Sequence, residues 1–165
     1  MKPRVLIIMG SDSDLSVMEE AAKVLRGFSI PFLMTVASAH RTPERTLRLA
    51  KNAEKSGIEV IIAGAGMAAH LPGVIASHTI IPVIGVPIDA SPFGGMDALL
   101  SMVQMPPGIP VATVAVGKAG AMNAGLLAAQ IMARNNPALA KKILDYRKEM
   151  AMELEEKAAK IERRN

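Results

Sequence analysis

Residues 5–14 read Val5-Leu6-Ile7-Ile8-Met9-Gly10-Ser11-Asp12-Ser13-Asp14 and carry the clearest signal of how this 165-residue chain folds. The first five residues are uninterruptedly apolar, without the alternation of a strand that has one face in water. Such a run is typical of a strand buried on both faces of a parallel sheet. The Ser and Asp residues that follow favour a helix start, and we expect a helix at about residues 15–26. The segment predicts a strand, a polar loop and a helix in succession.

The same succession recurs four times along the chain. Apolar runs of strand length are each followed by a helical pattern, at residues 32–37 and 43–56, 60–63 and 68–77, 83–86 and 95–103, and 111–116 and 121–133. Five such units predict an α/β fold, a three-layer αβα sandwich around a flavodoxin-like (Rossmann-like), doubly wound parallel sheet. Ligands of such sheets bind beyond the carboxyl ends of the strands, so we expect the functional residues in the loops after them.

The rest of the chain predicts one further helix and no second domain. A charged helical pattern occupies about residues 137–163, with an apolar stripe of Leu139, Ile143, Tyr146 and Met150 that could pack on its own subunit or reach a neighbour. The sequence has no domain linker, internal repeat or low-complexity segment. We therefore expect residues 1–165 to form a single domain, with a core at about residues 4–133.

Composition excludes several classes of function. The chain has no cysteine, and its three histidines are far apart in sequence, which argues against disulfides, cysteine nucleophiles and metal sites. It has no Gly-x-x-x-x-Gly-Lys-Ser/Thr loop, so ATP use is not predicted. A net charge of +4 and the near absence of aromatic residues argue against nucleic-acid binding. The first apolar run is interrupted at Gly10, so we expect no signal peptide. No stretch of about 18 apolar residues runs without glycine or proline, so we expect no membrane span and a cytoplasmic location.

The central part of the chain is almost uncharged. Residues 60–133 contain only Asp89, Asp97 and Lys118 as charged groups, and the helix expected at 121–133 is apolar nearly all round. Much of this surface would face other copies of the chain in a homo-oligomer. An unusually apolar parallel sheet with its covering helices is the alternative, and both interpretations can hold together.

The loop Ser38-Ala39-His40-Arg41-Thr42-Pro43 lies between an expected strand and an expected helix. Thr42 can cap that helix, and Pro43 suits its first turn. The N–H groups of a helix N-terminus favour an anion, and Arg41 adds a fork of donors that fits phosphate. His40 is the side chain type best suited to move protons near neutral pH. The hexapeptide predicts a phosphate anchor beside a proton carrier.

Two other loops can complete such a site. In the first, Ser11 and Ser13 can hold a phosphate and Asp14 can accept hydrogen bonds from sugar hydroxyls, although simple helix capping explains these residues about equally well. In residues 64–73, small residues would let a planar ring approach the backbone. His70 is either a second site histidine or a histidine bonded inside the fold. The turn at residues 89–95 either covers the site or merely reverses the chain.

Together these motifs resemble the PurE family of purine biosynthesis. The resemblance extends over about residues 4–133, and its elements occur in the family's order: Gly10-Ser11-Asp12-Ser13-Asp14, Ser38-Ala39-His40-Arg41-Thr42-Pro43, Gly64-Ala65-Gly66, Ala68-Ala69-His70-Leu71-Pro72-Gly73, Gly85-Val86-Pro87, Gln104-Met105-Pro106, Lys118-Ala119-Gly120-Ala121 and Asn123-Ala124. The Arg-Thr-Pro after His40 and the segment from Ala68 to Gly73 resemble the mutase branch. That branch converts N5-carboxyaminoimidazole ribonucleotide to the 4-carboxy isomer, an isomerase reaction of the de novo IMP pathway, without metal or cofactor.

The resemblance also implies roles for individual residues. His40 would be the general acid/base, and His70 would lie at the carboxylate or the gate. The family is usually a homo-octamer. The substrate-binding set would come from the same loops: Ser11, Ser13, Ser38 and Arg41 at the 5′-phosphate, Asp14 at the ribose hydroxyls, and Ala65, Gly66 and Leu71 beside the imidazole.

The chain departs from the family pattern near the expected site. Met67 stands where many relatives have glycine, and residues 89–95 differ from the commoner Ser-x-x-Leu-x-Gly version. Two other functions fit the motifs. One is a direct carboxylase that adds carbon dioxide to aminoimidazole ribonucleotide, and the other is a non-enzymatic nucleotide-binding oligomer, which would not need His40.

Overall fold

A computed structural model describes residues 2–163; residues 1, 164 and 165, at the ends of the expected domain, lie outside the described part. Its centre is a five-stranded, wholly parallel sheet of order β2-β1-β3-β4-β5. The strands are β1 (Val5–Met9), β2 (Phe32–Val36), β3 (Val60–Gly66), β4 (Val83–Ile88) and β5 (Ala112–Thr113). The order and direction confirm the predicted flavodoxin-like α/β sheet.

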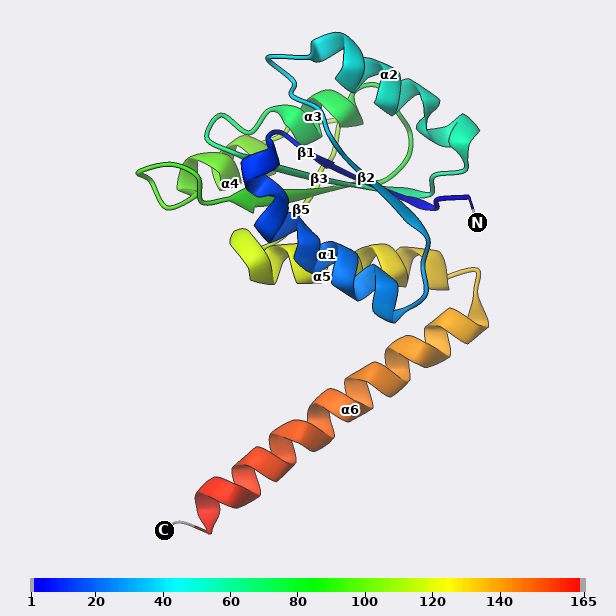
Figure 1. Cartoon of the computed structure of the whole chain (residues 1–165), viewed down its shortest axis with the longest axis vertical. Helices are drawn as coiled ribbons and strands as arrows, with labels where there is room; N and C mark the ends of the chain where they lie inside the picture. Colours follow the sequence, from blue (N-terminus) through cyan, green and yellow to red (C-terminus); the bar gives the residue numbers. More distant parts are fainter. Residues whose placement is uncertain (1, 164–165) are drawn as a thin grey trace.

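Helices cover both faces of the sheet, which gives the three predicted layers (Figure 1). The chain contains α1 (Leu15–Gly27), α2 (Pro43–Ala53), α3 (Leu71–Ala76), α4 (Met96–Val103), α5 (Gly117–Ala133) and α6 (Pro137–Glu162), and the short 3₁₀ helices η1 (Asp12–Asp14) and η2 (Glu54–Ser56). Buried residues of α1, α5 and the start of α6 share one hydrophobic cluster with the sheet. Buried residues of α2, α3 and α4 form the cluster on the other face.

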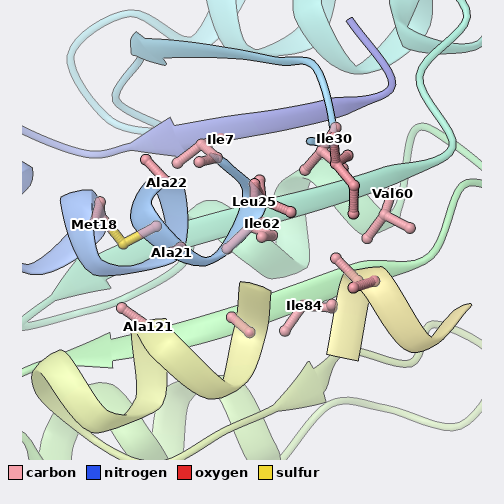
Figure 2. Packing of buried hydrophobic residues seen from close by; sticks show 14 of the residues in the cluster. Ile7, Met18, Ala21, Ala22, Leu25, Ile30, Val60, Ile62, Ile84 and Ala121 are labelled. Carbon is pink, nitrogen blue, oxygen red and sulfur yellow. The ribbon is translucent and has the colours of Figure 1, made fainter. Parts of the chain in front are cut away.

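Strand β1 shows why an unbroken apolar run is needed. All five of its residues are buried, and they alternate between the two clusters: Val5, Ile7 and Met9 face α1 and α5, whereas Leu6 and Ile8 face the opposite layer. Figure 2 shows the first of these clusters, with Ile7, Ile62 and Ile84 of the sheet around side chains of α1 and α5. The sequence pattern thus follows from burial on both faces.

Helix α5 is apolar because it packs within its own chain. Its buried residues are almost all small: Gly117, Gly120, Ala121, Ala124, Gly125, Ala128, Ala129 and Met132. Helix α1 lies so close to it that a Cβ on Gly125 would be 2.9 Å from Cβ of Val24. Packing within the chain, the alternative to an oligomer interface, therefore accounts for most of the apolar character of this helix. The homo-oligomer remains a prediction.

Several predicted boundaries were wrong: β4 continues to Ile88 instead of ending at residue 86, and α5 begins at Gly117 instead of residue 121. Three others have identifiable reasons. Strand β3 continues from residue 63 to Gly66, because its ladder with β4 extends through the pairs Ala65–Pro87 and Gly66–Ile88. Helix α3 begins at Leu71 instead of residue 68, because Met67 adopts a positive φ of 55° that ends the strand in a turn. Edge strand β5 has only two residues in place of the six expected, because only Ala112 and Thr113 pair with β4.

Helix α6 leaves the body of the molecule after a short docked segment. Asn136 caps it, since its Oδ1 accepts from the backbone N–H of Leu139 at 3.1 Å. Leu139 and Ile143 are buried, and the ring of Tyr146 meets that of Phe28 edge to face with centroids 5.7 Å apart. Met150 is 52% exposed, and from there the helix projects away from the sheet (Figure 1). No helix within residues 2–163 is both long enough and apolar enough to cross a membrane.

Candidate active site

One cavity of about 570 Å³ lies beyond the carboxyl ends of the strands. It gathers the loops after β1, β2 and β3 and the first residues after β4. Its lining comprises Gly10, Ser11, Ser13, Asp14, Ser38, Ala39, His40, Arg41, Ala65, Gly66, Met67, Ala68, His70, Leu71 and Ala90. Every predicted site residue is in this set, so the structure brings the whole expected constellation together, while the roles of these residues remain predictions.

Residues of the loop after β1 form hydrogen bonds to the buried carboxylate of Asp14. Ser11 caps η1, and its backbone N–H donates to Oδ2 of Asp14 at 3.1 Å. The Ser13 hydroxyl donates to Oδ1 of Asp14 at 3.4 Å, and Asp14 is only 5% exposed. Burial raises the pKa of Asp14 above its ordinary value, although these hydrogen bonds and the charge of Arg41 act in the opposite direction. Helix capping, the alternative we gave for these residues, therefore describes their hydrogen bonds to one another. Ser11, Ser13 and Asp14 also line the cavity.

The second loop is fastened to the first by Arg41. Nη2 of Arg41 donates to the carbonyl of Gly10 at 2.8 Å, and its backbone N–H donates to Oγ of Ser38 at 3.1 Å. These contacts leave other guanidinium donors free to bind a ligand. The arginine therefore connects the loops after β1 and β2 at the place where we expect the phosphate.

Thr42 does not cap α2 with its side chain, which corrects our expectation. It occupies the N-cap position, but its Oγ1 accepts from the backbone N–H of Ser38 at 2.9 Å and donates to the Ser38 carbonyl at 3.2 Å. Thr42 thus closes the loop into a ring. Pro43 is in the first turn of α2 as predicted, and no side chain caps the amides of that turn.

Two histidines meet in the cavity. Nε2 of His40 lies 2.8 Å from Nδ1 of His70, with the rings inclined at 77°. One nitrogen must donate and the other accept, so the two imidazoles cannot both be doubly protonated while this contact persists. Both side chains are exposed, and a bound molecule can reach them. The structure thus places His70 in the cavity and bonded to His40, and its role as a second site histidine remains a prediction.

The start of the third loop lies close to Ala90, a residue of the cavity lining that we did not predict from the sequence. A Cβ on Gly66 would lie 2.6 Å from Cβ of Ala90, so glycine is required where the ends of β3 and β4 converge. The only sequence signal for Ala90 was the expectation that the turn at residues 89–95 either covers the site or merely reverses the chain. Met67 also lines the cavity, and it is 59% exposed.

The cavity offers one guanidinium, one carboxylate and two imidazoles. Within residues 2–163, no group of three or more His, Cys, Asp or Glu side chains is placed to hold a metal ion. Lys118, Asn123 and His78 are exposed and lie outside this lining. The arrangement can bind an anion at Arg41 and the serines and transfer a proton at the histidine pair.

Comparison with known proteins identifies the family. The family model described as AIR carboxylase matches residues 4–153. The chain is 58% identical to an N5-carboxyaminoimidazole ribonucleotide mutase of Pyrococcus horikoshii, with 98% of this chain and 90% of that protein covered. For the enzymes of the same name from Thermotoga maritima and Escherichia coli K12, identity is 57% and 52%, with 97% and 88% of this chain and 92% and 86% of those proteins covered.

A solved structure agrees with the sequence comparison. The crystal structure of Treponema denticola PurE superposes with a TM-score of 0.86 at 31% identity, and the match covers 96% of this chain and 98% of that one. The similarity therefore extends over the sheet, the cavity loops and most of α6. The family expected from the motifs is confirmed: this chain belongs to the AIR carboxylase (PurE) family.

Proposed function

We propose that this protein is an N5-carboxyaminoimidazole ribonucleotide mutase, an isomerase of de novo purine biosynthesis. The observation that carries the proposal is the His40–His70 contact inside a cavity that also gathers Arg41, Asp14 and the serines of the loops after β1 and β2. Relatives with 52–61% identity bear the name of this mutase, which supports the same assignment. In the reaction the carboxylate moves from the exocyclic nitrogen N5 to ring carbon C4.

The first two loops bind the sugar phosphate in this proposal. The 5′-phosphate lies among Ser11, Ser13, Ser38 and Arg41, where the free guanidinium donors and the loop hydroxyls can each give a charge-assisted hydrogen bond. Asp14, buried one turn away, accepts from the ribose hydroxyls. Arg41 already holds the carbonyl of Gly10, so the phosphate would meet two loops that are joined before it binds.

The third loop receives the imidazole and its carboxylate. Ala65, Gly66 and Leu71 border the ring, because their small or buried side chains leave room for a planar group against the backbone. The N5–carboxylate bond breaks with its electron pair moving to N5, and C4 then attacks the released carbon dioxide. His40 removes the proton that C4 must lose to restore aromaticity and returns a proton to N5, so the atoms balance. His70 lies at the carboxylate and holds His40 through their contact.

Physical principles indicate what each part contributes. A positioned general acid/base typically increases the reaction rate roughly 10²–10⁴-fold. Retaining carbon dioxide beside C4 replaces a dilute bimolecular encounter with a local one. The reaction as written consumes no ATP and changes no oxidation state.

We further propose that the protein acts as a cytoplasmic homo-octamer of single-domain subunits, without nucleic-acid or membrane partners. The uncharged segment 60–133 supports the assembly, as do half-exposed apolar side chains on edge strand β2, on α4 and on the projecting part of α6: Leu33, Val36, Leu100, Val103, Met150 and Leu154. Light scattering of the purified protein should give eight times the protomer mass. A monomer would contradict the proposal.

A direct carboxylase is the second candidate, because the family description itself reads AIR carboxylase. The two reactions differ in the origin of the carboxyl carbon. N5-carboxyaminoimidazole ribonucleotide with a ¹³C-labelled carboxylate, incubated with the enzyme in excess unlabelled bicarbonate, tests both by NMR. Label retained at C4 supports the mutase, and unlabelled carboxylate at C4 supports the carboxylase. If neither product forms although the nucleotide binds, the protein is a binding oligomer.

A further inference from the structure

Met67 is strained at the mouth of the cavity. Its φ is 55°, and among residues 2–163 only one other non-glycine residue, Ser29 with φ 58°, has a positive φ. Residues other than glycine, asparagine and aspartate seldom adopt this left-handed conformation. Backbone strain of this kind concentrates at functional sites and persists only where the surroundings impose it.

The backbone around Met67 is fixed from both sides. Before it, Gly66 lies against Ala90, where a Cβ would come within 2.6 Å. After it, the N–H of Ala69 donates to the Met67 carbonyl at 2.9 Å and the N–H of His70 donates to the Ala68 carbonyl at 2.7 Å. Ala69 is buried at 2% exposure. These contacts impose the turn, and none of them involves the methionine side chain.

Ser29 shows that a positive φ can have an ordinary structural cause. It follows α1, and its N–H donates to the carbonyl of Arg26 at 2.9 Å, as expected for a residue that terminates a helix. Met67 follows a strand, and its side chain lines the cavity. Glycine would make the same turn without strain, so the side chain of Met67 needs a separate explanation.

The cavity has one long apolar side chain that is mostly exposed. The lining residues of the third loop are small except for Met67, His70 and Leu71, and Leu71 is buried at 2% exposure whereas Met67 is 59% exposed. Methionine has three rotatable side-chain bonds and adapts to irregular apolar contacts. It lies three residues before His70, at the end of the cavity where the carboxylate is transferred in the proposed reaction.

We propose that Met67 is a substrate-contacting cover that folds over the bound ribonucleotide and retains carbon dioxide during the transfer; this inference rests on the proposed mutase function. Carbon dioxide is uncharged and would be lost from an open, wet cavity. A thioether chain laid over the site removes water and presents an apolar surface to the free molecule. Met67 is thus predicted to act on the efficiency of capture, not on the proton transfer itself.

Three variants of the full-length protein test the proposal. Met67→Gly removes the cover and the strain, Met67→Leu keeps an apolar side chain of similar volume, and Ser29→Gly relieves the same kind of strain away from the cavity. The assay uses substrate with a ¹³C-labelled carboxylate in unlabelled bicarbonate. We expect Met67→Gly to raise the ratio of released to transferred label roughly tenfold, because the variant loses the apolar contact of about one half-buried side chain. KM should rise with it, while the melting temperature stays equal or higher.

The controls separate a cover from a structural role. Met67→Leu should restore label retention and KM, and Ser29→Gly should change only the melting temperature. Wild-type label retention and KM in Met67→Gly would overturn the proposal, and so would a folded Met67→Leu variant that behaves like Met67→Gly.

A readout that needs no turnover separates this inference from the proposed function. In protein labelled with ¹³C at the methionine methyls, the signal that Met67→Leu abolishes should shift when aminoimidazole ribonucleotide binds. A shift in a protein that fails to transfer label would keep Met67 as a cover over the bound nucleotide, but it would refute the mutase assignment and with it the retention of carbon dioxide. An unshifted signal under saturating nucleotide would refute the cover, whatever the reaction.

Discussion

Replacing Gly66 with alanine should loosen the cavity at the point where β3 meets the turn after β4. The added Cβ would lie 2.6 Å from Cβ of Ala90 and 3.1 Å from the carbonyl oxygen of Ile88. Carbon atoms in ordinary contact are about 3.5–4.0 Å apart, so the first of these contacts is about 1 Å too short. Overpacking of this size typically costs about 1–3 kcal/mol. Because Ala90 is exposed, we expect the turn to move outward, which would widen the cavity and raise KM.

The assay is denaturant unfolding at a fixed protomer concentration, followed by steady-state kinetics at the same concentration. Gly27→Ala is the matched control, because Gly27 ends α1 and a Cβ there meets nothing within 4 Å. That variant should be neutral or gain up to about 1 kcal/mol from better helix propensity, with unchanged KM. A Gly66→Ala protein within about 0.5 kcal/mol of wild type and with wild-type KM would refute the reasoning, since surface substitutions without a packing effect fall in that range.

Three other variants test the cavity. His40→Asn should lose roughly 10²–10⁴-fold in kcat with nucleotide affinity kept, whereas His78→Asn, outside the cavity, should change neither; a His40→Asn enzyme with normal turnover would remove that residue from the mechanism. Arg41→Ala should weaken nucleotide binding about 10–150-fold in calorimetry, from loss of about 1.5–3 kcal/mol of charged hydrogen bonding. Arg45→Ala, whose guanidinium bonds Val36 and Thr35 outside the cavity, is its control, and equal affinities for the two variants would contradict the phosphate site. Burial raises the pKa of Asp14, so folding favours the protonated form of this side chain. The stability that the protonated form contributes is fully present below the unfolded pKa of about 3.9. It is lost as the pH rises through the pKa of the folded state. Asp14→Asn should therefore melt higher than wild type at pH 7 but not at pH 3.5, and an advantage that is independent of pH would show that ionisation of Asp14 is not its cause.

The strands could be predicted because burial on both faces demands continuous apolar residues. Val5–Met9 had the predicted bounds, and all of its residues are buried. The prediction for strand β3 was too short because Gly64, Ala65 and Gly66 lack the bulky side chains that are typical of a strand. In the structure the missing volume is supplied from outside the sheet: Met18 of α1 fills the place where a Gly64 side chain would be. Small residues in a strand can thus indicate close packing as well as a loop.

The members of the site could be predicted, but the contacts among them could not. Each loop carried residue types suited to phosphate or proton chemistry at a strand end, and the parallel sheet places those ends along one edge. The 2.8 Å contact between His40 and His70 depends on two loops that are separated by 30 residues, and on the turn at Met67. That turn arises from the close approach of Gly66 and Ala90, which no local pattern reveals.

The strand order explains why the residues proposed for binding and those proposed for proton transfer lie in one cavity. The chain passes from β1 outward to β2 and then returns across β1 to β3, so the connections leave β1 and β3 toward opposite faces of the sheet. A crevice opens at this reversal, between the loop that carries Asp14 and the loop that carries His70. The loop after β2 reaches over this crevice, where Arg41 holds the carbonyl of Gly10 and His40 holds His70. Adjacent residues of this loop therefore join it to the loop after β1, where we propose the phosphate, and to the loop after β3, where we propose the ring. We expect a rigid shift of this loop to disturb nucleotide affinity and turnover at once, whereas loss of either side chain alone disturbs only one of them.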